Sequence, residues 1–189
     1  MGDIGSHAEN LAEYMTGLKM VQLCADLNTI VEGRRLDDDG NVLVHWETGV
    51  KGLLHSSQIA HGEENGLKIQ IYGSQAGLEW EQEHPNYLYI KRHNGPMQVW
   101  KRGNEYIGEV SPAAGRATRL PFGHPEAFFE AFANLYTNYA EVLNARLDNT
   151  VPDPLALDFP GIDDGVRGVA FIEACVESAR KGAVWVRVE

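Results

Sequence analysis

The sequence predicts an α+β protein: a large open, mainly antiparallel β-sheet with helices packed on one face. Between residues 19 and 110, turn-forming residues recur at close to the roughly 8–12-residue spacing of successive antiparallel strands. Several runs between these turns alternate apolar and polar residues, most sharply at 67–71 and 78–81. Helical spacing of apolar residues appears before this region and again after residue 125. Together these observations indicate a meander with one apolar face that helices cover.

The first element is a helix predicted over residues 3–17, where apolar residues lie three or four positions apart and Gly17 offers a C-terminal stop. The meander follows. The acidic run ending at Gly40 has Arg35 and Trp46 where a calcium loop needs its first and last ligands, so a hairpin turn is predicted there. The predicted strands are residues 20–31, 41–48, 51–61, 67–72, 78–83, 87–92, 97–101 and 105–110.

The helices that cover the sheet are predicted after a loop over 111–123. Pro125 suits the first position of a helix and Glu126 its first turn, and an apolar stripe continues to about residue 147. A second helix, capped by Asp163 or Asp164, is predicted to end near residue 182, before a short strand at 183–188. We expect one domain over 1–189, whose open sheet face forms a homodimer or higher homo-oligomer.

The composition is that of an ordinary globular protein, with 43% apolar and 23% charged residues. The formal net charge of −11 argues against nucleic-acid and anionic-membrane partners, since both require clustered cations. Cys24 and Cys175 form neither a metal-ligand pattern nor a disulfide framework. With no secretory signal and no long apolar run, the sequence predicts a cytoplasmic protein without a bound metal.

Asp3 and His7 are the candidate catalytic pair. Four residues apart on the predicted helix, they share one face, and a carboxylate beside an imidazole raises the basicity of the ring. Such a pair can take a proton from a hydroxyl whose carbon loses a hydride. On spacing alone, a capping Asp3 and a partly buried His7 are the favoured interpretation of the pattern.

Five segments resemble the C-terminal domain of the Gfo/Idh/MocA oxidoreductases, in the order found in that family. They are GDIGSHA (2–8), LLHSSQIAHG (53–62), LKIQIYGSQAGLEW (67–80), GHPEAFFEAF (123–132) and DGVRGVAFIEA (164–174). The resemblance implies the substrate-binding and oligomerisation part of an NAD(P)-dependent dehydrogenase acting on a sugar or cyclitol-like polyol. It implies His7 as proton acceptor or relay and Asp3 as the residue that orients it.

The resemblance also shows what these residues lack. No strand–G-x-G-x-x-G–helix unit is present, and Gly161, Gly165 and Gly168 follow Pro160 at the wrong spacing. The family's Glu-Lys-Pro motif is missing too. The expectation is that the chain binds no cofactor and is inactive alone, although NAD or NADP is implied for the complete enzyme.

Four further residues are candidates for substrate binding. His124 belongs to the Gly-His-Pro that borders the substrate pocket in similar proteins, and Gln58 and His61 lie near a strand end among other polar groups. Arg119, with Arg116 nearby, could clamp an acidic or hydroxylated substrate. Ordinary surface roles remain open for all of them. The alternative function is a non-catalytic α+β protein that self-associates or binds a ligand through its sheet.

Overall fold

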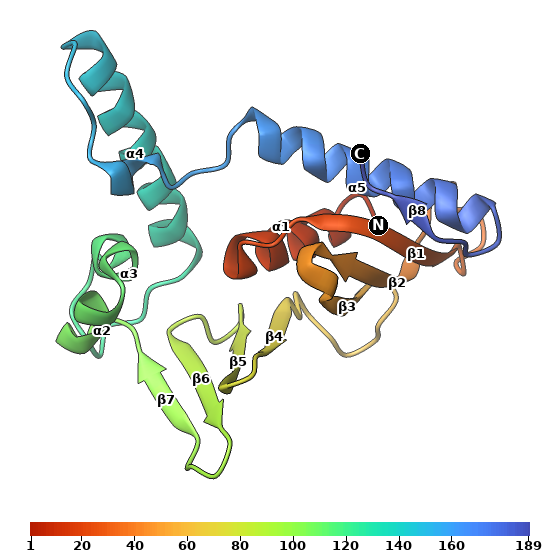
Figure 1. Cartoon of the computed structure of the whole chain (residues 1–189), viewed down its shortest axis with the longest axis horizontal. Helices are drawn as coiled ribbons and strands as arrows, with labels where there is room; N and C mark the ends of the chain where they lie inside the picture. Colours follow the sequence, from red (N-terminus) through yellow and green to blue (C-terminus); the bar gives the residue numbers. More distant parts are fainter. The chain divides into compact units, whose positions relative to one another are not determined.

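The computed structural model describes all 189 residues and confirms the α+β fold (Figure 1). The chain divides into two compact units: Met1–Glu64 together with Pro160–Glu189, and Asn65–Phe159. Each unit contains a four-stranded antiparallel sheet, so the strands that the sequence predicts in one large sheet form two. No helix combines the length and the apolar character that crossing a bilayer requires.

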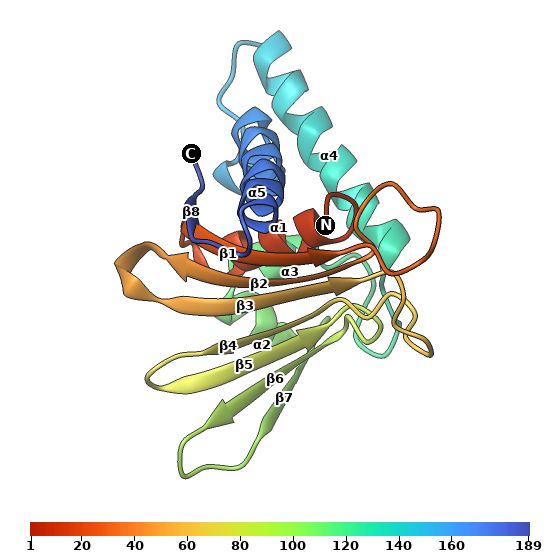
Figure 2. The ribbon, with the colours of Figure 1, turned by 90° about the vertical axis from the view of Figure 1, so that its right-hand side faces the viewer.

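The first unit is a sheet covered on one face by two helices (Figure 2). Leu23, Ala25, Val42 and Val44 point toward these helices and are essentially inaccessible to solvent, and Phe171 packs among them. Alternate residues along each strand therefore build the core. The sheet order is β3-β2-β1-β8, from β1 (Met20–Asn28), β2 (Asp39–Trp46), β3 (Lys51–Ser57) and β8 (Val186–Arg187); the helices are α1 (Gly5–Thr16) and α5 (Ile162–Arg180), with a 3-10 turn η1 (Glu47–Gly49).

Ser178 joins α5 to the edge of this sheet. Its hydroxyl accepts a hydrogen bond from the backbone N–H of Ala25 (2.8 Å) and donates one to the carbonyl oxygen of Val184 (2.5 Å). Strand β8 is too short to reach Ala25, because its ladder with β1 involves only Gln22 and Leu23. The serine supplies the partner that a buried backbone N–H requires.

The second unit contains the sheet β4-β5-β6-β7, whose strands alternate as the sequence predicts. Ile71, Leu78 and Ile90 share one face, and Gln70, Glu79 and Lys91 lie on polar positions. Its elements are β4 (Lys68–Tyr72), β5 (Ala76–Glu81), β6 (Tyr87–Arg92), β7 (Gln98–Lys101), α2 (Glu105–Val110), α3 (Pro112–Ala117), α4 (Phe128–Leu147) and a 3-10 turn η2 (Pro154–Leu157).

Two elements of this unit differ from the sequence predictions. The predicted strand at 105–110 is the helix α2, and the predicted loop at 111–123 contains α3. Asn104 begins α2 in an extended conformation and Glu105 lies in the first turn, where a carboxylate stabilises a helix. Ser111 caps α3 by accepting a hydrogen bond from the backbone N–H of Ala114. The acidic first turn of α2 and the side-chain cap of α3 thus favour helices where the sequence predicts a strand and a loop.

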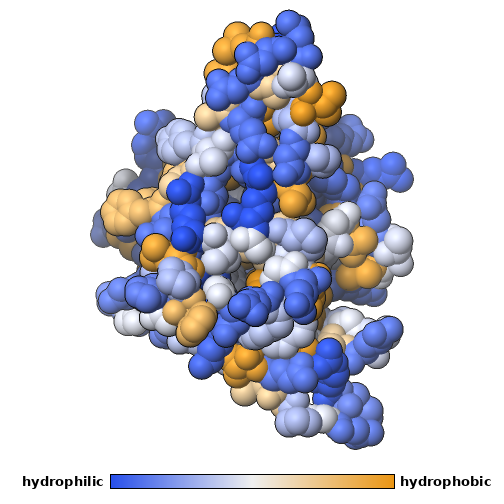
Figure 3. Space-filling model, turned by 90° about the vertical axis from the view of Figure 1, so that its left-hand side faces the viewer, coloured by the Kyte–Doolittle hydropathy of each residue, from blue (hydrophilic) through white to orange (hydrophobic).

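The start of α4 differs as well. The helix begins at Phe128, so Pro125 and Glu126 precede it instead of forming its first turn. Glu130 caps the helix by accepting a hydrogen bond from the backbone N–H of Ala127 (2.9 Å). Within its unit α4 packs mainly on η2, and much of its predicted apolar stripe is exposed, including Phe129 (81%). On the face shown in Figure 3, hydrophobic side chains are interspersed with hydrophilic ones.

Candidate functional site

A cleft of about 650 Å³ lies in the first unit. It is bordered by the residues just before α1, by the loop between β1 and β2, and by the end of β3. Charged and amide side chains share its wall with apolar groups: Asp3, Ile4, Arg34, Arg35, Leu36, Asp37, Asp38 and Gln58. A concave surface with a few converging polar groups is the usual form of a small-molecule site.

Asp3 and Gln58 meet at this cleft, 55 positions apart in the chain. The amide Nε2 of Gln58 donates a hydrogen bond to the Asp3 carboxylate over 2.9 Å. Gln58 directly follows β3, and its backbone N–H donates to the carbonyl oxygen of Asp38 (2.8 Å). The fold therefore brings together two residues that sequence reasoning selected for separate reasons, and both remain exposed to a ligand.

Asp38 holds the loop that forms the opposite wall. Its carboxylate is 3% exposed and accepts hydrogen bonds from the backbone N–H groups of Ile30 (2.8 Å) and Val31 (2.9 Å) and from Arg34 (3.3 Å). These hydrogen bonds, the two from the backbone above all, hold its pKa below the usual value. The tight turn predicted at 37–40 is wrong: a longer loop over 29–38 connects the strands, and Gly40 lies within β2.

His7 and His61 are exposed and make no hydrogen bond in the structure. His7 lies on α1, whereas Asp3 lies in the turn before this helix, which begins at Gly5. The Asp3 carboxylate contacts Gln58 and makes no ion pair with the imidazole. The two candidate catalytic residues are therefore close in sequence without forming the direct carboxylate–imidazole pair that helical spacing suggests.

Behind His7, the buried face of α1 carries an acidic pair that sequence reasoning missed. Glu9 and Glu13 are 3% and 7% exposed, one turn apart. The Glu13 carboxylate receives two hydrogen bonds from Arg167 on α5, one of them from Nε over 2.8 Å. Burial and the neighbouring Glu13 raise the pKa of Glu9 to about 7. The signal in the sequence was the four-residue spacing of Gly5, Glu9 and Glu13, which places them on one stripe.

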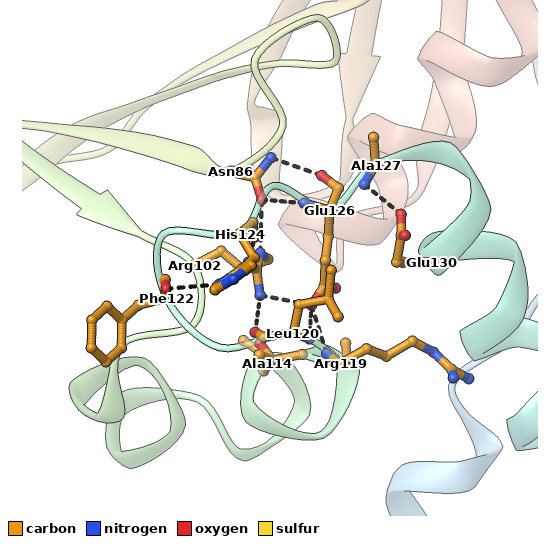
Figure 4. A network of polar contacts seen from close by, with 12 residues as sticks. Asn86, Arg102, Ala114, Arg119, Leu120, Phe122, His124, Glu126, Ala127 and Glu130 are labelled. Atoms are coloured by element: carbon orange, nitrogen blue, oxygen red, sulfur yellow. Dashed lines mark hydrogen bonds and ion pairs between the residues drawn. The ribbon is translucent and has the colours of Figure 1, made fainter.

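His124 and Arg119 belong to the second unit and differ in their surroundings (Figure 4). The His124 ring is exposed, with Nδ1 3.4 Å from the carbonyl oxygen of Phe122. The Arg119 guanidinium donates to Asn134 Oδ1 and Thr137 Oγ1, each over 2.6 Å, on α4. Together with Arg116 it lines a cavity of about 330 Å³. Most N–H donors of the Arg119 guanidinium are therefore already used in hydrogen bonds to α4.

Comparison with known proteins identifies this architecture. Residues 1–79 match the model of the GFO/IDH/MocA C-terminal domain. The uncharacterized oxidoreductase YfiI of Bacillus subtilis is 35% identical over 190 residues, which cover 98% of this chain and 47% of YfiI. The chain belongs to the GFO/IDH/MocA C-terminal domain family. The predicted resemblance is thereby confirmed.

Solved structures of similar proteins share the fold of this GFO/IDH/MocA C-terminal domain. An oxidoreductase from Sinorhizobium meliloti is 41% identical with a TM-score of 0.90, over 97% of this chain and 51% of its own. An inositol dehydrogenase homologue from Azotobacter vinelandii, solved with NADH and myo-inositol, is 37% identical with a TM-score of 0.88, over 98% of this chain and 48% of its own. The chain spans about half the length of the relatives that it matches.

The residues of this GFO/IDH/MocA C-terminal domain do not fit a dinucleotide. Both sheets are antiparallel, and neither contains the strand–turn–helix unit that holds a pyrophosphate. At the glycine-rich start of α5, the backbone N–H of Gly161 already donates a hydrogen bond to the Asp164 carboxylate (2.7 Å), so this N–H is not available to a phosphate. With Asp163 beside it, this helix end repels a phosphate.

Proposed function

We propose that this chain is the substrate-binding and oligomerisation part of an NAD(P)-dependent oxidoreductase that acts on a sugar or cyclitol-like polyol. The observation that carries the proposal is the Asp3–Gln58 hydrogen bond at the cleft of the first unit. A carboxylate offers acceptors and an amide offers both donors and acceptors, which suits the hydroxyl groups of a polyol. The Azotobacter vinelandii homologue solved with NADH and myo-inositol supports this substrate class.

In this proposal Asp3 and Gln58 bind substrate hydroxyls, and His7 accepts the proton of the hydroxyl whose carbon is oxidised. An exposed imidazole without a hydrogen bond is free to take this proton. His61 is proposed to contribute a further substrate contact in the first unit, and Arg119 and His124 are proposed as substrate-binding residues of the second unit. The nicotinamide, NAD or NADP, is proposed to bind outside these 189 residues, so the chain alone does not turn over its substrate.

Binding of myo-inositol to the full chain tests this function. We expect calorimetry to detect binding, and we expect the Asp3→Asn and Gln58→Leu variants to lose about tenfold or more in affinity, because a hydrogen bond to a charged group contributes about 1.5–3 kcal/mol. Gln22→Leu is the matched control, since the Gln22 amide contacts His45 outside the cleft. Absence of myo-inositol binding, or equal affinity in all four proteins, would contradict the proposal. NADH added alone is expected not to bind.

Self-association through the open face of the first sheet is part of the same proposal. Cys24, Leu43 and Leu53 form one row across three strands on this face, and Leu43 and Leu53 are 51% and 70% exposed. We expect sedimentation at micromolar concentration to show a dimer or larger oligomer that the Leu43→Lys/Leu53→Lys variant dissociates. Val151→Lys, at an exposed apolar position of the second unit, is the control. A monomeric wild-type chain would rule this part out.

A further inference from the structure

The loop between β1 and β2, residues 29–38, forms one wall of the cleft in the first unit, and two consecutive arginines of this loop, Arg34 and Arg35, line the cleft. In Figure 2 the loop extends beyond the ends of the two strands. Asp3 and Gln58 lie on the other wall, where they bind each other. The charges of the loop therefore influence which polyol the cleft accepts.

The backbone on both sides of Arg35 is held by hydrogen bonds within the loop. The N–H of Arg34 donates to the carbonyl oxygen of Val31 (3.3 Å), and the carbonyl oxygen of Leu36 accepts a hydrogen bond from the Thr29 hydroxyl (3.2 Å). A ligand that binds Arg35 therefore has to order only the arginine side chain and not the loop that carries it. A contact that is ordered beforehand in this way loses less conformational entropy on binding.

The two arginines differ in what they bind. The Arg34 guanidinium pairs with the buried carboxylate of Asp38 over 3.3 Å, so its charge is used within the loop. The Arg35 side chain is exposed and makes no hydrogen bond or ion pair in the structure. An arginine carries a positive charge and five N–H donors in a planar arrangement. At Arg35 all of these donors are available to a ligand.

Every carboxylate that lines the cleft already has a donor bound to it: Asp3, Asp37 and Asp38. Arg35 is thus the one charged side chain of the cleft without a partner. A ligand with an anionic group of its own supplies that partner. Because the Asp3 carboxylate repels such a group, the charges orient the ligand with its acid at the loop and its hydroxyl groups at Asp3 and Gln58.

We propose that the preferred ligand of this cleft is a polyol that carries an acid group, a carboxylate or a phosphate ester, and that Arg35 binds this group. The inference rests on the proposed function, in which Asp3 and Gln58 bind the hydroxyl groups. A guanidinium can donate two parallel hydrogen bonds to a carboxylate or a phosphate, and such charge-assisted pairs are stronger than hydrogen bonds to a neutral hydroxyl. Neutral polyols such as myo-inositol then bind the same cleft more weakly.

The test is calorimetry on the full chain with two matched pairs of ligands: myo-inositol with myo-inositol 1-phosphate, and glucose with glucuronate. The members of a pair share a carbon skeleton and differ in the acid group. Inorganic phosphate is a further probe, since it has the charge without the polyol. The wild type is compared with Arg35→Gln. Lys51→Gln is the matched control, because Lys51 is an exposed cation of the same unit that does not line the cleft.

We expect the acidic member of at least one pair to bind the wild type at least tenfold more tightly than its neutral counterpart, and more tightly than inorganic phosphate binds. This preference should disappear in Arg35→Gln, persist in Lys51→Gln, and weaken as the salt concentration rises. Arg35→Gln is expected to fold as the wild type does, because Arg35 is exposed and has no partner. Equal affinities within both pairs, or a preference that persists in Arg35→Gln, would overturn the proposal.

The outcome for the proposed function is read separately, from the neutral ligands. If the wild type binds myo-inositol without any preference for the acidic ligands, the polyol site stands and the role of Arg35 fails. If none of the four polyols binds, the proposed function fails and this inference fails with it. NADPH is titrated into the same proteins, because its phosphates are another source of anions. Binding of NADPH that Arg35→Gln removes would assign Arg35 to the dinucleotide and overturn the proposal.

Discussion

Replacing Arg167 with methionine is expected to lower the free energy of unfolding by about 3 kcal/mol, because the buried Glu13 carboxylate loses the guanidinium that binds both of its oxygens. Arg167 binds both oxygens of Glu13, and Glu9 lies one turn away on the same buried face of α1. Without the guanidinium, Glu13 keeps only the Lys19 ammonium (3.0 Å) and the backbone N–H of Met20 (2.9 Å). The contact between α1 and α5 then contains two acids and no arginine.

Urea denaturation at pH 7 measures this loss. Arg180→Met is the control, since Arg180 lies on the same helix, is exposed, and should change stability by less than about 0.5 kcal/mol. Adding Glu13→Gln to Arg167→Met removes the buried carboxylate that has lost its guanidinium partner and should restore part of the stability. An Arg167→Met variant as stable as Arg180→Met would show that this ion pair contributes nothing net.

The second large effect is expected at Glu9, and it depends on pH. Burial raises the pKa of Glu9 to about 7 in the folded chain, with a further contribution from Glu13, against an ordinary value of 4.5. The folded state therefore binds this proton more tightly, and the associated stability is fully present below pH 4.5 and lost as the pH rises through 7. Glu9→Gln, which stays neutral, should be more stable than the wild type by about 2 kcal/mol at pH 8 and about equal at pH 5.

Denaturation curves at pH 5 and pH 8 check this sign, with Glu13→Gln as the contrasting variant. Burial by itself would raise the pKa of Glu13, but hydrogen bonds from Arg167, the Met20 N–H and Lys19 hold it below the usual value. The Glu13 carboxylate therefore stabilises the fold above its ordinary pKa, and Glu13→Gln should destabilise at both pH values. A Glu9→Gln variant that is less stable than the wild type at pH 8 would mean that Glu9 is a favourable anion.

The sequence was most informative where one face of a regular element is buried. Alternation located the strands around Ile71 and Leu78, and helical spacing with Gly17 located α1 and its end. It was least informative where capping and tertiary contacts decide. Residues 105–110 have side chains that suit a strand, yet the extended Asn104 and Glu105 in the first turn give a helix. The division of the strands into two sheets leaves no local signal, because both sheets show the same alternation.

At the candidate site, too, the sequence indicates individual residues but not the contacts between elements that are far apart in the chain. Asp3 and Gln58 were selected from polar residues in context, and the contact between them depends on long-range folding that the sequence does not display. Glu126 had been interpreted from its position after a proline as a helix-start residue, whereas its carboxylate binds Arg102 and two backbone amides. The spacing of residues in the sequence indicates which side chains are neighbours within one helix or strand. It does not indicate which buried carboxylate pairs with an arginine from another element.

The first unit is formed by two stretches of chain with the whole of the second unit between them. The ion-pair partner of Glu13, Arg167, lies 154 positions further along the chain. The edge strand β8, which pairs with β1, is also synthesised late, near residue 186. On the ribosome, helix α1 leaves the exit tunnel with its acidic stripe uncovered, while residues 65–159 can already pack among themselves. Translation therefore completes residues 65–159 before the first unit has all of its chain, and a pause or a nick ahead of α5 would leave residues 1–64 exposed to chaperones and proteases.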